Sequence, residues 1–128
     1  MQKRFLNFAK VYYPKFKREE VVKVLRENLK DFRLKQDIRK AYLFGSYATK
    51  KFTVASDIDI LVVVDDKVDK NKFYNILVKS LKLKGLEPHI LKESEYLNLK
   101  RLNSKWIKTI ENEGILIWEN LKREMKVK

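Results

Sequence analysis

The chain of 128 residues contains no cysteine, only three glycines, two prolines and a single histidine, His89. Without cysteine, disulfide bonds and thiolate metal sites are excluded. No apolar stretch approaches the roughly 20 residues that a membrane-spanning helix needs. The charged N-terminal residues are not followed by the hydrophobic core of a signal peptide. We therefore expect no membrane partner and a cytoplasmic location.

The sequence also lacks stretches rich in proline, glycine or serine, internal repeats and low-complexity tracts, so no linker divides it. A chain of 128 residues can bury a real core within one domain. We predict a single domain over residues 1–128, with an N-terminal extension over about 1–18 and a frayed basic tail over about 119–128.

Basic side chains are abundant: 30 Lys and Arg stand against 17 Asp and Glu, which gives a net charge of +13. Residues 1–40 contain 13 basic and 5 acidic side chains, so much of the excess lies there. Such an excess favours polyanionic partners, namely RNA, nucleotides or an acidic protein surface. A Lys-rich, heat-adapted composition has the same appearance, so the charge alone leaves both interpretations open.

Hydrophobic periodicity predicts a small α/β (α+β) domain in which a short mixed sheet is flanked by helices. Helices are expected over 19–32, 71–84 and 95–113, and strands over 41–44, 58–64 and 86–92. Residues 115–118 are expected to add a short edge strand or to pack back on the core.

Several residues refine these elements. The β-branched run 58–64 is too continuous for an edge strand, so it should be central. Pro88 lacks a backbone donor, which favours a strand end or an edge strand for 86–92. Gly85 and Gly114 fit the ends of the second and third helices. The third helix is expected to place Leu99, Leu102, Trp106 and Ile110 on one face.

Asp57 and Asp59 stand at the start of the central strand. Residues two apart in a strand leave the same face, so the two carboxylates should lie side by side. They would repel each other unless a cation lies between them. A divalent metal removes the conflict, and hard oxygen ligands suit Mg²⁺ or Mn²⁺. A third acidic group from a neighbouring strand would complete a two-metal site for phosphoryl transfer.

Gly45 and Ser46 follow the first strand. A strand that ends in Gly-Ser and opens a helical turn presents free backbone N–H groups and a hydroxyl, which can hold a phosphate. Gly45 allows the backbone to approach that phosphate because it has no Cβ. Alone, each pair of residues also fits an ordinary turn or a solvated strand start.

Together, the pattern G-S-x-A-x-x-x-x-x-x-x-S-D-I-D-I resembles the signature of the minimal nucleotidyltransferases of the DNA polymerase beta superfamily. Its positions are filled here by Gly45, Ser46, Ala48, Ser56, Asp57 and Asp59. The resemblance extends more loosely from the helix near 19–32 to the strand near 86–91.

This resemblance implies an Mg²⁺-dependent nucleotidyltransferase that moves a nucleoside monophosphate, expected to be AMP from ATP, to a protein or nucleic-acid acceptor. Gly45 and Ser46 would bind the triphosphate, and Asp57 and Asp59 would bind the metals. The family's third carboxylate falls at Glu87, where many members have Asp. His89, which is expected to be structural or exposed, could instead assist or replace Glu87.

The chain departs from the family where Thr49-Lys50 replaces the common Arg-Gly; Lys50 or Lys51 could supply the missing charge as a point charge. Stand-alone members are often paired with a HEPN-domain toxin, which implies a possible role as its antitoxin. The alternative function is a catalytically weak module of the same fold that neutralises a partner protein or binds RNA. The sequence leaves the acceptor and the oligomeric state open.

Overall fold

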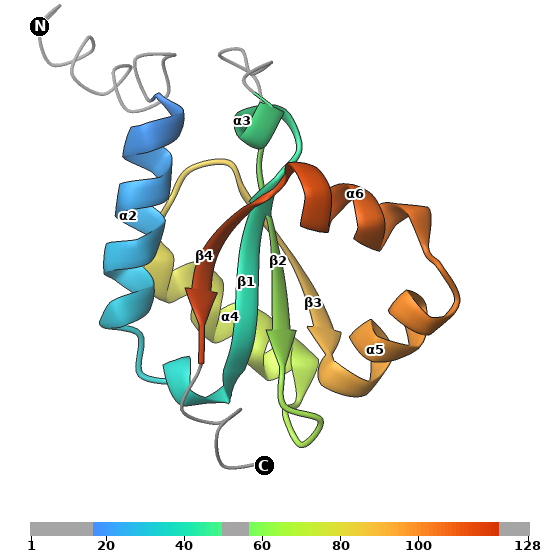
Figure 1. Ribbon diagram of the computed structural model, residues 1–128. Helices are drawn as coiled ribbons and strands as arrows, with labels where there is room; N and C mark the ends of the chain where they lie inside the picture. The colour runs from blue at the N-terminus through green and yellow to red at the C-terminus, as the bar shows by residue number, and fades with distance from the viewer. Residues whose placement is uncertain (1–16, 50–56, 121–128) are drawn as a thin grey trace, which may run out of the picture.

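The computed structural model describes residues 17–49 and 57–120, which form a four-stranded mixed sheet flanked by helices (Figure 1). The strands are β1 (Ile38–Phe44), β2 (Ile58–Val64), β3 (Leu86–Lys92) and β4 (Ile115–Glu119). The helices are α2 (Arg18–Lys30), α3 (Ser46–Thr49), α4 (Lys70–Leu81), α5 (Glu93–Arg101) and α6 (Lys105–Glu113), with a short 3-10 helix, η1, at Lys35–Asp37. The predicted fold class is confirmed.

The strand order is β3-β2-β1-β4. β1 runs antiparallel to both β2 and β4, whereas β2 and β3 run parallel. The first residues of β2 and β3 therefore meet the last residues of β1 at one end of the sheet. The prediction of a central strand over 58–64 is confirmed, and so is the edge position that Pro88 favoured for 86–92. Residues 115–118 form the other edge, within β4.

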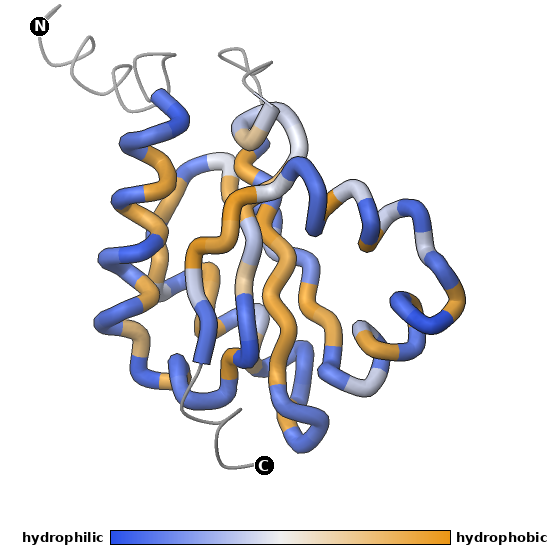
Figure 2. Tube along the Cα trace, viewed as in Figure 1, coloured by the Kyte–Doolittle hydropathy of each residue, from blue (hydrophilic) through white to orange (hydrophobic). Residues whose placement is uncertain are grey.

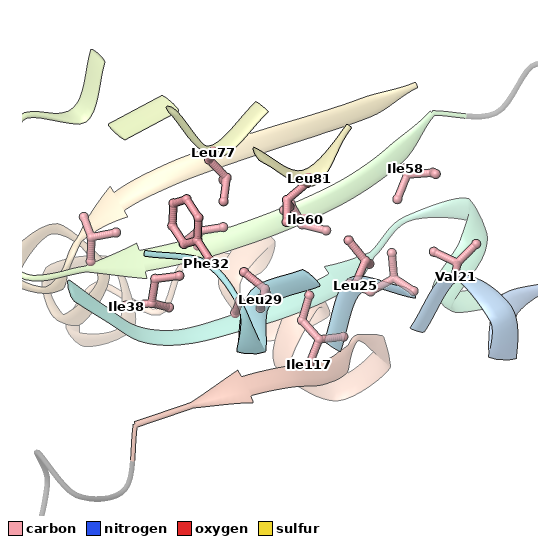
Figure 3. Packing of buried hydrophobic residues seen from close by; sticks show 14 of the residues in the cluster. Val21, Leu25, Leu29, Phe32, Ile38, Ile58, Ile60, Leu77, Leu81 and Ile117 are labelled. Atoms are coloured by element: carbon pink, nitrogen blue, oxygen red, sulfur yellow. The ribbon is translucent and has the colours of Figure 1, made fainter. Parts of the chain in front are cut away.

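Alternate residues of β2 enter two separate cores, as strand geometry requires. Ile58, Ile60, Val62 and Val64 pack with the apolar sides of α2 and α4, and Figure 3 shows Ile58 and Ile60 in this core. Leu61 and Val63 pack with side chains of α5 and α6 on the opposite face. Figure 2 shows the result as a hydrophobic central strand, with polar residues on the outer sides of the helices. A strand buried on both faces explains the continuous apolar run.

Several boundaries differ from the prediction: α2 spans Arg18–Lys30 where a helix over 19–32 was expected, and β1 begins at Ile38 where a strand over 41–44 was expected. The helix expected over 71–84 begins one residue earlier, where the Asp69 side chain accepts hydrogen bonds from the N–H groups of Asn71 and Lys72. It ends at Leu81, because Lys82 takes a left-handed conformation with φ of 50°. Gly85 therefore lies in the turn before β3 and does not end the helix.

The helix expected over 95–113 is wrong as a single element, because the structure divides it into α5 and α6. Asn103 adopts a left-handed φ of 60°, and the Ser104 side chain accepts a hydrogen bond from the N–H of Ile107 to begin α6. The break leaves Leu102 and Trp106 outside the core cluster on this face of the sheet, and they are 64% and 40% exposed. The predicted shared apolar face is therefore incorrect at these two residues.

A cluster of polar side chains joins α5 to α6 on the face of the sheet that these two helices cover. The Tyr96 hydroxyl donates a hydrogen bond to Glu111 Oε2, and Lys100 Nζ lies 3.2 Å from the same oxygen. Burial and the Glu111 carboxylate raise the pKa of Tyr96 far above its ordinary value. Burial opposes ionisation of Glu111, but its hydrogen bonds with Tyr96 and Lys100 outweigh this effect and lower its pKa.

Within the described residues, no helix is long and apolar enough to cross a membrane. The predicted N-terminal extension falls almost entirely on residues 1–16, and most of the predicted tail falls on 121–128. Both ranges lie outside the described residues.

Candidate active site

The candidate site lies at the end of the sheet where β1 stops and β2 and β3 begin (Figure 1). Asp59, the second residue of β2, is paired across the sheet with Phe44 on one side and Glu87 on the other. Glu87 and His89 are two residues apart in β3 and therefore leave the same face of the sheet. This topology brings the start of two parallel strands and the end of β1 to one place.

Asp59, Glu87 and His89 form a compact group of possible metal ligands. One ligand atom from each residue lies within 4.8 Å of the others. His89 Nε2 is 3.4 Å from Asp59 Oδ1, and the two side chains are 39% and 28% exposed. The group is thus accessible to solvent but partly enclosed, as a site for an exchangeable ligand must be.

The backbone of Gly45 lies directly against this group. Its φ is +78°, in the region that favours glycine. A Cβ added at this position would lie 2.7 Å from Asp59 Oδ2. The glycine at the end of β1 therefore allows the carboxylate of Asp59 to sit against the backbone of the turn. Sequence reasoning assigned Gly45 to a phosphate; the structure adds a contact with the metal-ligand group.

Ser46 begins α3, the single helical turn that follows Gly45. The turn is closed by a hydrogen bond of 3.1 Å from the Thr49 N–H to the Gly45 carbonyl. Arg18 of α2 donates a hydrogen bond of 2.9 Å to the Ala48 carbonyl, so α2 supports the same turn. The predicted strand, Gly-Ser and helical turn are therefore present in that order.

An aromatic wall borders the ligand group on one side. The rings of Phe44 and His89 are 5.2 Å apart between centroids, and those of His89 and Trp106 are 6.0 Å apart. Phe44 and Trp106 meet edge to face at 5.9 Å. Trp106 comes from α6, so the break between α5 and α6 determines which side chain stands beside His89.

The donor set fits a divalent cation. Two carboxylates and one imidazole offer oxygen and nitrogen ligands of the kinds that Mg²⁺, Mn²⁺ and related ions bind. Within residues 17–49 and 57–120, no Lys or Arg forms an ion pair with Asp59 or Glu87. Two carboxylates this close need positive charge, and a dication would supply it.

The remaining predicted site residues are distributed differently. Asp57 is exposed and immediately precedes β2, outside the group formed by Asp59, Glu87 and His89. Its role as a metal ligand stays a prediction. Lys50, Lys51 and Ser56 lie outside the described residues, so the expected contribution of the lysines also stays a prediction.

The structure places His89 in the candidate ligand group and Trp106 beside it, whereas sequence reasoning expected His89 to be structural or exposed and gave Trp106 no place near the site. The signal for His89 was its position two residues after Glu87 in a predicted strand, which places both side chains on one face. For Trp106, the signal was Asn103-Ser104, a pair that suits a left-handed residue followed by a helix N-cap.

Comparison with known proteins identifies the relatives of this chain. The sequence profile of the family described as "Polymerase beta, Nucleotidyltransferase" matches residues 27–123. The "Putative protein adenylyltransferase MJ0604" of Methanocaldococcus jannaschii is 37% identical over 81 residues, which are 63% of this chain and 79% of that protein. A second protein of the same organism and the same description, MJ0141, is 29% identical over 75% of this chain and 97% of its own length.

Two solved structures resemble the fold. A crystal structure of a "putative nucleotidyltransferase" from Sulfolobus solfataricus has a TM-score of 0.52 and 20% identity, covering 82% of this chain and 86% of the other. A toxin-antitoxin structure with AMP-PNP has a TM-score of 0.49 and 21% identity, covering 84% and 77%. The first supports the nucleotidyltransferase fold.

Proposed function

Because the chain belongs to the polymerase beta nucleotidyltransferase family, we propose that it transfers AMP from ATP to a protein acceptor. The observation that carries this proposal is the group of Asp59, Glu87 and His89 against the Gly45 turn. Ligands for a divalent cation and a turn suited to a triphosphate thus adjoin each other at one end of the sheet.

In the proposed reaction, an oxygen of the acceptor attacks the α-phosphorus of ATP. A bond forms between that oxygen and the α-phosphorus, and the bond from the α-phosphorus to the α,β-bridging oxygen breaks. Pyrophosphate leaves with the electrons of that bond, and the proton of the acceptor hydroxyl passes to solvent. Mg²⁺ or Mn²⁺, two ions in the complete site, would neutralise the triphosphate and the charge that develops on it.

Each residue has a defined part in this proposal. Asp59 and Glu87 would bind the metal, with Asp57 as a further ligand from the residue that precedes β2. Gly45 and Ser46 would receive the triphosphate at the start of α3, through backbone N–H groups and the Ser46 hydroxyl. Since phosphoryl transfer relies on positioning and electrostatics, the closeness of these two parts favours this chemistry.

The acceptor is proposed to be a protein because the relative that is 37% identical over most of its length is described as a protein adenylyltransferase. The resemblance to minimal nucleotidyltransferases names a class of acceptor, a small helical HEPN-domain protein. A gene for such a protein beside the gene for this chain would identify the acceptor to test.

The test incubates the full chain with ATP labelled at the α-phosphate, Mg²⁺ or Mn²⁺, and the HEPN-domain protein. We expect label on the acceptor with the wild type, and a loss of roughly a thousandfold or more with Asp59→Asn. Asp31→Asn is the matched control, since Asp31 is an exposed aspartate at the far end of α2. It should transfer label as the wild type does.

Calorimetry gives a readout that needs no acceptor. The wild type should bind ATP with the metal, and Asp59→Asn should weaken that binding at least roughly tenfold, because it removes a ligand charge. No binding of ATP at millimolar concentration would overturn the proposed function. Binding without transfer to the acceptor would favour the alternative, a binding module of the same fold.

A further inference from the structure

We propose that His89 is a direct metal ligand, which makes the site a mixed nitrogen and oxygen site that prefers Mn²⁺ to Mg²⁺. This inference rests on the metal site of the proposed function, but it does not depend on the transfer reaction. It concerns the identity of the third ligand, which the family resemblance assigned to Glu87, with His89 left open as an assisting or replacing residue.

The distances fit a shared ion. Ligand atoms about 2.1 Å from one metal lie roughly 3 Å apart when adjacent and about 4.2 Å apart when opposite. His89 Nε2 and Asp59 Oδ1 are 3.4 Å apart, and the three donor atoms, including one of Glu87, lie within 4.8 Å of one another. Small side-chain rotations would bring all three onto one ion.

The surroundings of His89 orient its ring. Phe44 and Trp106 contact the imidazole at centroid distances of 5.2 and 6.0 Å, with interplanar angles of 58° and 65°. Neither Phe44 nor Trp106 offers an acceptor that would draw Nε2 away from Asp59. The aromatic wall therefore acts as a positioning element that keeps Nε2 directed at the carboxylates.

Charge favours a metal over a simple ion pair. A protonated His89 would bring one positive charge to two carboxylates, Asp59 and Glu87. Among the residues that the structure describes, neither carboxylate has an ion pair with Lys or Arg. A dication bound by neutral imidazole balances both carboxylates, and the lone pair on Nε2 is then used for coordination.

The ligand types determine the preference. Mg²⁺ takes oxygen ligands almost exclusively and gives up water reluctantly, whereas imidazole suits transition metals. Of the two ions compared, Mn²⁺ is the transition metal, so it accepts an imidazole beside carboxylates more readily than Mg²⁺ does. A site with only carboxylate ligands would lack this preference for Mn²⁺ over Mg²⁺.

The test exploits the fact that His89 is the single histidine among the 128 residues. The untagged full chain is loaded with Mn²⁺, without nucleotide, in a buffer free of nitrogen ligands. Pulsed electron paramagnetic resonance then detects coupling of the manganese electron spin to ¹⁴N. We expect an imidazole coupling in the wild type and in the Asp31→Asn control, and none in His89→Asp.

Binding constants provide the second measurement. The ratio of the Kd for Mg²⁺ to the Kd for Mn²⁺ should fall roughly tenfold or more in His89→Asp, because its ligand set is all oxygen. Circular dichroism checks that the variant is folded. If it does not fold, the ¹⁴N measurement on the wild type still decides the question.

The outcomes separate this inference from the proposed function. Manganese bound at Asp59 without ¹⁴N coupling, or an unchanged metal ratio in folded His89→Asp, would overturn the role of His89 and leave nucleotidyl transfer intact. Imidazole coupling in a chain that neither binds ATP nor transfers AMP would support His89 and overturn the proposed function. No binding of Mn²⁺ at millimolar concentration would overturn the inference directly.

Discussion

Acidic side chains have different partners at the two ends of the sheet. At the end away from the site, Arg39 of β1 lies 3.3 Å from Asp65 and 3.1 Å from Glu93, and both Arg39 and Asp65 are only 16% exposed. At the site end, Asp59 and Glu87 have the imidazole of His89 beside them and no ion pair with a described Lys or Arg. At both ends, these residues lie in β1, β2 or β3 or directly follow one of these strands.

The carboxylates at the two ends of the sheet differ in what neutralises their charge. An arginine between two carboxylates neutralises their charge within the fold, and its removal takes that cation away from two partly buried carboxylates. Carboxylates without such a partner repel each other in the metal-free protein and become stable when a cation arrives. We therefore expect substitutions at the two ends to affect stability and metal binding in opposite patterns.

Asp59→Asn should have the largest effect on binding. It removes a metal ligand, so the affinity for Mn²⁺ should fall roughly hundredfold or more. The midpoint of thermal unfolding should stay the same or rise, since the substitution relieves repulsion with Glu87. Metal titration followed by thermal denaturation checks both. A loss of stability above about 1 kcal/mol would mean that Asp59 has a partner in the fold, as Asp65 does.

Gly45→Ala should lower both the stability of the fold and the affinity for the metal. The left-handed φ and the clash of the new Cβ with the Asp59 carboxylate should lower the free energy of unfolding by roughly 1–3 kcal/mol and weaken metal binding. Gly85→Ala is the control, because Gly85 has a similar φ of 80°. It should lose stability but keep the metal affinity. Equal metal affinities in the two variants would contradict the contact of Gly45 with Asp59.

Arg39→Met should show the reverse pattern of Asp59→Asn. Loss of the shared cation for Asp65 and Glu93 should lower the free energy of unfolding by roughly 1–3 kcal/mol, measured in urea. Metal affinity should not change. Lys70→Met is the comparison, since its ion pair with Glu95 is exposed and should contribute at most about 0.5 kcal/mol. If Arg39→Met and Lys70→Met were equally stable, the ion pairs of Arg39 would contribute no more to stability than an exposed pair does, which would contradict the proposed difference between the two ends of the sheet.

Tyr96→Phe should have the smallest effect at neutral pH, about 1 kcal/mol for the lost hydrogen bond to Glu111. Its effect on pH dependence is clearer. Burial raises the pKa of Tyr96 in the folded state, above the unfolded value of about 10. Its contribution to stability is therefore complete below pH 10 and is lost as the pH rises further.

Urea unfolding between about pH 9 and 11 measures this dependence. The free energy of unfolding should fall less steeply with pH in Tyr96→Phe than in the wild type. Equal slopes would show that Tyr96 is free to ionise in the folded protein, and that the polar cluster between α5 and α6 is weaker than its geometry indicates.

The sequence predicted the fold and the parts of the site that depend on local pattern. The continuous apolar run of 58–64 identified a central strand, and Gly45-Ser46 with Asp59 was recognisable by spacing. Pro88 placed β3 at an edge. These features are encoded within a few residues of one another, where periodicity and turn chemistry act directly.

What the sequence did not predict depends on contacts between distant segments. The apolar positions around Leu102 keep a helical spacing across the break, so periodicity alone predicted one helix. The orientation of Trp106, and with it the aromatic wall beside His89, follows from that break. The contact of His89 with Asp59 requires the parallel register of β2 and β3, and register is a property of the folded sheet.

The edge position of β3 has a consequence for motion. Glu87 and His89 belong to a strand with one paired neighbour, β2, whereas Asp59 belongs to a strand buried on both faces. Edge strands open locally at a lower free energy than central ones, without global unfolding. A metal bound by residues of both β2 and β3 would stabilise the closed state of β3 against this local opening. Amide hydrogens of β3 should therefore exchange more slowly when the ion is bound, while those of β1 keep their rates. Metal occupancy would then set the local stability of one side of the domain.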